Sequence, residues 1–225
     1  MVPANFTPND FSVVDFADLI HPRISIQPKY FELGFSGSPK IYGRGAVRDR
    51  LLAALELLPP DYGFHIWDIY RPRSVQAVLF DWMRAEIKKR SPQLTDEENF
   101  AEACNFAALP SSLGEFNCSP HLSGGAIDLT LFEVATGNIV DMGTVFDDCS
   151  EHAYRDYFNK LTVLTAEQQL IKTMRDYLRN AMERVGFVSY EYEWWHFDIG
   201  DRLWGKVTGH APVFGPLFDD NEWPA

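Results

Sequence analysis

The sequence contains few cysteines and fewer basic than acidic side chains. Its three cysteines, Cys104, Cys118 and Cys149, form no C-x-x-C pair, and an odd number cannot complete a disulfide framework. We therefore expect three inert thiols, buried or half-buried. The 32 acidic side chains outnumber the 20 Lys and Arg, and the formal charge of -12 repels the phosphates of nucleic acids and anionic lipids. Binding to nucleic acid or to a membrane is disfavoured, although a local basic pocket stays open.

Signals for membrane insertion and export are also missing. No segment reaches the roughly 18 consecutive apolar residues that a membrane span requires. The first residues, Met1 to Asn5, carry no basic stretch and precede no continuous apolar run, so they do not resemble a signal peptide. We therefore expect a soluble, cytoplasmic protein. Its oligomeric state stays open, a homo-oligomer included.

The 225 residues do contain enough apolar and aromatic side chains, 46% and 14%, to form a sizeable core. Apolar spacing predicts helices from Ala46 to Leu58, after Pro72 (Val75, Val78, Leu79, Trp82 and Ile87) and from Thr165 to Val185 (Leu170, Met174, Leu178 and Met182). Capping boxes at Thr95 and Thr165, and Gly186 at a helix end, support these assignments. Strands are expected over Gly63–Tyr70 and Phe187–Trp195. The sequence thus predicts one α+β domain, residues 1–225, with a small and mostly antiparallel sheet flanked by helices.

The segment from Ser119 to Thr130 contains a potential metal-binding pair. His121 and Asp128 are separated by an odd number of residues, so a regular strand would point them to opposite faces. The Gly124-Gly125 pair between them permits a tight turn that removes this restriction. An imidazole nitrogen and a carboxylate oxygen suit zinc. A surface histidine followed by an aspartate at a strand start is the alternative interpretation.

The segment Glu193-Trp194-Trp195-His196 supplies what such a site would still need. His196 would be a third ligand, and three protein ligands with one open position form the catalytic zinc arrangement. Glu193 would then be the general base, provided that the backbone leaves the strand near Trp194 so that both side chains face the site. The alternative is an ordinary strand whose tryptophans are core residues. Arg71, beside Pro72 at a strand end, suits the stabilisation of a developing oxyanion.

Taken together, these residues resemble the D-alanyl-D-alanine dipeptidase family of zinc metallopeptidases, peptidase family M15. Four landmarks occur in the family's order and cover most of the chain: Trp67–Pro72, Ser119–Thr130, Met142–Asp147 and Glu193–His196. The resemblance implies a Hedgehog/DD-peptidase-like fold and hydrolysis of free D-Ala-D-Ala to two D-alanines. It also implies a role in peptidoglycan metabolism, with vancomycin resistance or the reuse of wall dipeptides as alternatives that stay open.

The resemblance further implies roles for individual residues. One zinc ion per chain would be held by His121, Asp128 and His196, with Glu193 as catalytic base and Arg71 stabilising the tetrahedral intermediate. Ser119 and Asp147 match positions that line the substrate pocket, and we assign Asp147 to the ammonium group of the dipeptide. The family also has a tyrosine in its N-terminal region, for which Tyr30 is a candidate.

Two other functions remain open on the sequence alone. A zinc carboxypeptidase or endopeptidase acting on peptidoglycan stem peptides would share the metal site but need an open groove. A non-catalytic zinc-binding module of the same fold would have no use for Glu193. Substrate preference also stays open, because Pro120, Leu122 and Ser123 depart from the family's more frequent residues.

Overall fold

The computed structural model describes residues 6–218 and confirms the α+β class with a mostly antiparallel sheet. A five-stranded sheet has the order β2-β4-β5-β7-β6, in which only the β2–β4 pair is parallel. A second, two-stranded sheet joins β1 and β3. The strands are β1 (Val13–Asp15), β2 (Ile24–Ile26), β3 (Tyr42–Arg44), β4 (Tyr62–Asp68), β5 (Ala126–Glu133), β6 (Val188–Ser189) and β7 (His196–Asp198).

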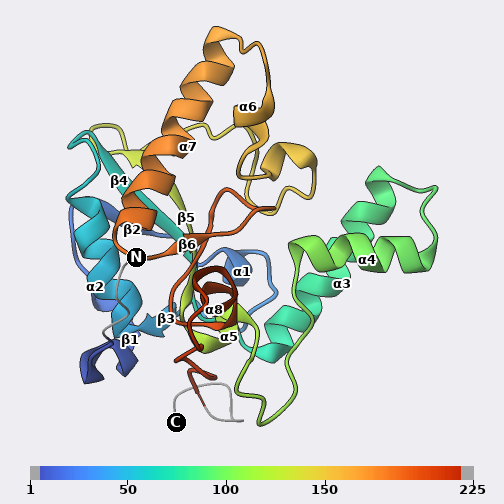
Figure 1. The fold of residues 1–225 in the computed structure, drawn as a ribbon, viewed down its shortest axis with the longest axis horizontal. Coiled ribbons are helices and arrows are strands. Elements are labelled where there is room, and N and C mark those ends of the chain that lie inside the picture. The colour runs from blue at the N-terminus through green and yellow to red at the C-terminus, as the bar shows by residue number, and fades with distance from the viewer. Residues whose placement is uncertain (1–5, 219–225) are drawn as a thin grey trace.

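Helices flank the larger sheet, as Figure 1 shows. The α-helices are α1 (Lys29–Glu32), α2 (Gly45–Leu55), α3 (Arg73–Arg90), α4 (Asp96–Phe106), α5 (Pro120–Ser123), α6 (Tyr157–Lys160), α7 (Ala166–Arg184) and α8 (Arg202–Thr208). Short 3-10 turns occur at Pro8–Phe11, Phe16–Asp18 and Glu151–Ala153. Both predicted capping boxes form, at the starts of α4 and α7. Within residues 6–218, no helix combines the length and apolar character that crossing a membrane requires.

The main core lies between one face of the five-stranded sheet and helices α2 and α7. Alternate residues of β5, namely Ile127, Leu129 and Leu131, are fully buried there. They pack with apolar side chains of α2 (Val47, Leu51, Leu55) and of α7 (Met174, Leu178, Met182). Because strand side chains alternate between faces, Asp128 and Thr130 point to the other side of the sheet. That second face carries the polar site described below.

Helices α3 and α4 form an arm that projects from the body of the molecule (Figure 1). They pack around a small apolar cluster of their own, with Phe80, Met83, Ile87, Ala103, Phe106 and Ala107 as its buried members. The first helix of this arm is the one predicted after Pro72, and the second begins at the capping box predicted at Thr95. We call α3 and α4 together the helical arm.

Three details of the predicted elements are wrong. The strand expected over residues 187–195 is two short strands, β6 and β7, separated by a turn through Trp194 and Trp195. Val78 is 44% exposed and Leu170 is 61% exposed, so neither belongs to the buried face of its helix. In α3 the buried face is completed by Phe80 and Met83, and in α7 by Ile171. A further short helix, α8, follows the one predicted to be last.

Candidate active site

Neighbouring strands place three titratable side chains in one row on the second face of the sheet. Asp128 of β5 is paired in register with Asp68 of β4 on one side and with His196 of β7 on the other. All three are at least 93% buried, with exposures of 2% for Asp128, 7% for Asp68 and 6% for His196. Buried charged groups without compensating partners are costly, so such a row indicates a functional site.

A β-bulge in β4 directs Asp68 into this row. The register shifts between Ile66, which opposes Leu129, and Asp68, which opposes Asp128. Two residues of β4 therefore oppose one step of β5, with Trp67 as the extra residue. Without the bulge, Asp68 would share the core face with Ile66, because residues two apart in a regular strand point the same way.

The glycine pair brings His121 over the row, as the sequence predicted. His121 belongs to the short helix α5, which ends at Gly124 in the left-handed conformation (φ 69°). Gly125 then starts the return into β5, and a Cβ atom there would lie 2.4 Å from the carbonyl oxygen of Ile199. Glycine is therefore required at both positions for the chain to turn and approach β7 closely.

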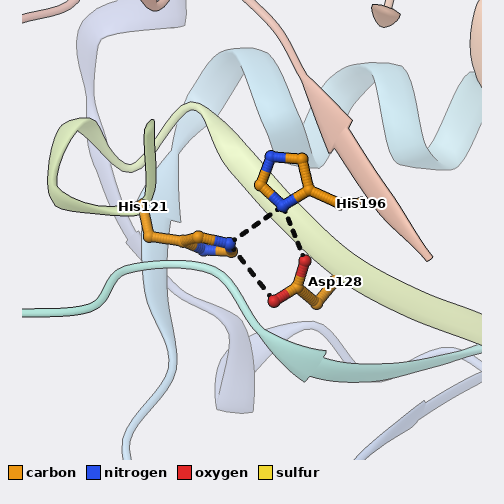
Figure 2. Close-up of side chains that lie close together, drawn as sticks. All are labelled: His121, Asp128 and His196. Atoms are coloured by element: carbon orange, nitrogen blue, oxygen red, sulfur yellow. Dashed lines mark hydrogen bonds and ion pairs between the residues drawn. The ribbon is translucent and has the colours of Figure 1, made fainter. Parts of the chain in front are cut away.

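His121, Asp128 and His196 form a tight cluster of potential ligand atoms (Figure 2). His121 Nε2 lies 3.1 Å from His196 Nδ1 and 3.2 Å from Asp128 Oδ2, and His196 Nδ1 lies 2.9 Å from Asp128 Oδ1. A tetrahedral ion with bonds of about 2.1 Å separates its ligand atoms by about 3.4 Å. The spacing and the nitrogen and oxygen donors thus fit a zinc ion at a possible metal site.

Both imidazoles are held with one ring nitrogen directed toward this cluster. His121 Nδ1 donates to the carbonyl oxygen of Ile69 (2.7 Å), and His196 Nε2 donates to Asp198 Oδ1 (2.8 Å). The remaining nitrogens, His121 Nε2 and His196 Nδ1, are thereby left free to accept a metal. Burial would raise the pKa of Asp128, but the imidazoles, His121 foremost, hold it well below its ordinary value. Asp128 is therefore a carboxylate.

A second buried acid lies behind Asp198. Asp201 is fully buried and caps α8 by accepting hydrogen bonds from the amides of Leu203 and Trp204. Burial, and then the nearby Asp198 carboxylate, raises the pKa of Asp201 well above its ordinary value. A proton is therefore held more readily on Asp201 than on an exposed aspartate.

Arg71 connects the acidic row to the edge of the site. Its Nε donates to Asp68 Oδ2 (2.8 Å), one terminal nitrogen donates to Asp128 Oδ2 (3.1 Å), and the other donates to Gln76 Oε1 (3.1 Å). Its guanidinium also lies 4.4 Å from the ring centre of Tyr30. The side chain is buried and held in one orientation, as a donor aimed at a reaction intermediate needs to be.

Glu193 meets the cluster from the turn between β6 and β7. Its Oε2 lies 3.8 Å from His196 Nδ1, and the side chain is 7% exposed. The chain leaves the strand at this point, so that Glu193 and His196 can face the same site. Burial raises the pKa of Glu193 well above its ordinary value, opposed in part by His196.

Asp147 and Tyr30 form a further pair beside Arg71. The Tyr30 hydroxyl lies 3.1 and 3.2 Å from the two carboxylate oxygens of Asp147 and donates to them. Burial raises the pKa of Asp147 to about 7, although Arg71 lowers it. Asp147 has a φ of 60°, a left-handed conformation rare for residues other than glycine and concentrated at functional sites.

All seven residues singled out in the sequence line one cavity of about 140 Å³: Arg71, Ser119, His121, Asp128, Asp147, Glu193 and His196. Tyr30, the candidate tyrosine, lines it as well. The helical arm forms part of its wall through Leu79, Phe106, Ala107 and Ala108, and α8 adds Arg202 and Leu203. The sequence did not indicate Asp68, Gln76, Asp198 or Arg202. Only Asp198 had a usable signal, since it follows His196 by two residues and a strand would place both on one face.

The three cysteines are free thiols. Cys118 is buried and Cys149 half-buried, but Cys104 is exposed, so the expectation of burial is wrong for that residue. His152 is exposed and is not among the residues that line this cavity. Trp194 and Trp195 are 4% and 1% exposed and belong to the main core, as their interpretation as packing residues required.

Comparison with known proteins identifies the family. A family model described as Peptidase_M15, D-ala-D-ala dipeptidase, matches residues 45–213. The chain is 31% identical to a D-alanyl-D-alanine dipeptidase of Enterococcus faecium, over 80% of this chain and 87% of the relative. It is 29% identical to one of Synechocystis, over 74% of this chain and 72% of the relative. A solved structure titled VanYB in complex with D-Alanine-D-Alanine matches 77% of this chain and 82% of its own at 17% identity, with a TM-score of 0.44. The family model and these relatives show that the chain belongs to the M15 family of metallopeptidases.

Proposed function

We propose that the chain is a zinc-dependent dipeptidase that hydrolyses free D-alanyl-D-alanine, or a similar small dipeptide, to its two amino acids. The observation that carries the proposal is the meeting, in one cavity of about 140 Å³, of the three-ligand cluster with Glu193 and Asp147. Matching relatives are named D-alanyl-D-alanine dipeptidase, which supports this substrate. We further propose that residues 1–225 act as one domain with one zinc ion.

His121, Asp128 and His196 would hold the ion. The set fits because each imidazole directs one ring nitrogen at the cluster while the other nitrogen is held by a fixed oxygen, and because Asp128 is ionised. When bound, zinc supplies Lewis-acid polarisation of the scissile carbonyl and acidifies water. Asp198 and the carbonyl group of Ile69 keep the two rings in place, as supporting partners of metal-binding histidines do.

Glu193 would move the proton during hydrolysis. Its carboxylate lies beside the cluster and has no arginine or lysine within ion-pair distance among the described residues. A buried carboxylate with a raised pKa is a good proton acceptor near neutral pH. Glu193 would take a proton from the attacking water and then deliver it to the nitrogen of the leaving amino acid.

Arg71 would stabilise the charge that develops on the carbonyl oxygen. Its guanidinium is fixed by Asp68, Gln76 and Asp128, so it needs little reorganisation when the charge appears. The Asp68 carboxylate also compensates the buried positive charge. A donor held in this way favours the transition state over the ground state.

Asp147 would bind the ammonium group of the dipeptide, with Tyr30 holding the carboxylate in position. An N-blocked substrate leaves this buried acid without a cation, at a cost of several kcal/mol. We therefore expect N-acetyl-D-Ala-D-Ala, and a pentapeptide ending in D-Ala-D-Ala, to have kcat/KM values at least about a hundredfold below that of the free dipeptide. Product analysis by chromatography measures this, with L-Ala-L-Ala as a control for stereochemical preference.

Comparable kcat/KM for free and N-blocked substrates would contradict the dipeptidase proposal. That result would favour the carboxypeptidase alternative, which acts on peptidoglycan stem peptides. If zinc bound but no peptide were cleaved, the non-catalytic module would be favoured instead.

The pH dependence of the reaction tests Asp147 and Glu193 together. Both must be ionised to work, and burial raises both pKa values, that of Asp147 to about 7. An acid is protonated below its pKa, so kcat/KM for the dipeptide should fall as the pH decreases through about 7. The bound ammonium group lowers the pKa of Asp147, so kcat should fall less than kcat/KM. Zinc content measured at each pH is the control for loss of metal, and a flat profile between about pH 5 and 8 would contradict the assignment.

A further inference from the structure

Two arginines line the cavity, Arg71 and Arg202, and they differ in how many hydrogen bonds they already make with other protein groups. Arg71 is buried and donates to Asp68, Gln76 and Asp128. Arg202 is exposed, and its side chain has no hydrogen bond or ion pair with any of residues 6–218. Arg202 is therefore the cation that remains available to a ligand.

Arg202 belongs to the Ser119 side of the cavity. Its charge acts on the thiol of Cys118, the residue before Ser119, as does that of Asp201. A backbone hydrogen bond supports this position. The amide of Ile199 donates to the carbonyl oxygen of Gly125 (3.0 Å), which brings the segment before α8 against the loop after α5. Asp147 instead faces the Arg71 guanidinium and accepts hydrogen bonds from the Tyr30 hydroxyl. The cavity therefore has an acidic end at Asp147 and a basic edge beside Ser119.

The position of Arg202 at this edge is fixed by the residue before it. Asp201 is fully buried and caps the first turn of α8 through the amides of Leu203 and Trp204. The backbone at Arg202 is thus held in place, and Arg202 and Leu203 both line the cavity.

A free dipeptide is a zwitterion, and its two charges need partners of opposite sign. With the ammonium group assigned to Asp147 and Arg71 engaged by buried acids, the α-carboxylate still needs a cation. A guanidinium binds a carboxylate through two parallel hydrogen bonds, a geometry that a lysine does not reproduce. We propose that Arg202 binds the α-carboxylate of the dipeptide at the Ser119 side of the cavity. This inference rests on the proposed function.

The test compares the free dipeptide with its C-terminal amide, D-Ala-D-Ala-NH2, which lacks the carboxylate charge. In Arg202→Gln, kcat/KM for the free dipeptide should fall roughly tenfold, mainly through a higher KM. This loss is modest for a charged hydrogen bond because the arginine is exposed. The amide should be cleaved equally by the wild type and the variant. Arg202→Lys should recover part of the loss, and added salt should reduce it.

Lys206→Gln is the matched control, because it removes one positive charge from the exposed side of the same helix without lining the cavity. It should leave both substrates unaffected, and zinc content should be the same in all variants. An equal loss on both substrates in Arg202→Gln, or no loss on either, would overturn the assignment while leaving the dipeptidase activity established. If the wild-type zinc enzyme cleaved neither substrate, the proposed function would fail first and this assignment with it.

Discussion

Replacing His196 with alanine is expected to remove most of the bound zinc and essentially all peptidase activity. The side chain is 6% exposed and supplies one of three clustered ligand atoms, 2.9 Å from Asp128 Oδ1 and 3.1 Å from His121 Nε2. Loss of only a supporting partner of a ligand typically costs about 10- to 100-fold in metal affinity, so loss of a ligand should exceed a hundredfold. His121→Ala and Asp128→Ala should behave alike, because the three residues act as one set.

Elemental analysis of the purified variants, with titration of zinc against a chelator, measures this. His152→Ala is the matched control, because His152 is exposed and lies outside the cavity lining. It should retain its zinc. Full zinc retention in His196→Ala would remove His196 from the ligand set and require a different third ligand.

Glu193→Gln is expected to keep the zinc and lose turnover. The loss should be on the order of 10² to 10⁴ in kcat, and larger if the same group delivers the proton to the leaving amine. Glutamine has the same shape but cannot accept the proton. Because burial raises the pKa of Glu193, its ionised form opposes folding, and a neutral side chain removes that cost. The variant should therefore be at least as stable as the wild type near neutral pH.

Zinc content, thermal unfolding and steady-state rates on one preparation separate these effects. Glu191→Gln is the control, since Glu191 is exposed and precedes Glu193 by two residues. It should change none of the three measurements. Near-wild-type turnover in zinc-loaded Glu193→Gln would place the general base elsewhere.

The sequence predicted seven of the residues that line the cavity, because their chemistry is confined to short motifs. The ligand pair His121 and Asp128 is recognisable from the glycines between them, and Gly124 does adopt the left-handed conformation that the turn needs. The prediction that the chain leaves the strand near Trp194 is confirmed by the turn before β7. Their roles in catalysis remain predictions until the variants are measured.

Partners supplied by tertiary structure could not be predicted. Asp68 enters the site because of a β-bulge at Trp67, and a bulge has no reliable signature in a single sequence. Gln76 and Asp128 meet Arg71 from separate segments, so no spacing indicates the contact. The alternating aromatic residues after Gly186 predicted one long strand, yet both tryptophans are buried in the main core from a turn.

The helical arm and the main core each form one wall of the cavity, and the two walls pack in separate apolar clusters. His196 and Asp128 stand on strands of the main core, whereas Phe106 and Ala107 belong to the separate apolar cluster of α3 and α4. A change in the packing of that cluster can reshape the wall around the substrate while leaving the metal ligands in register. Selection, natural or in the laboratory, can therefore alter which dipeptides are accepted by mutating the arm, without first having to rebuild the chemistry that cleaves them.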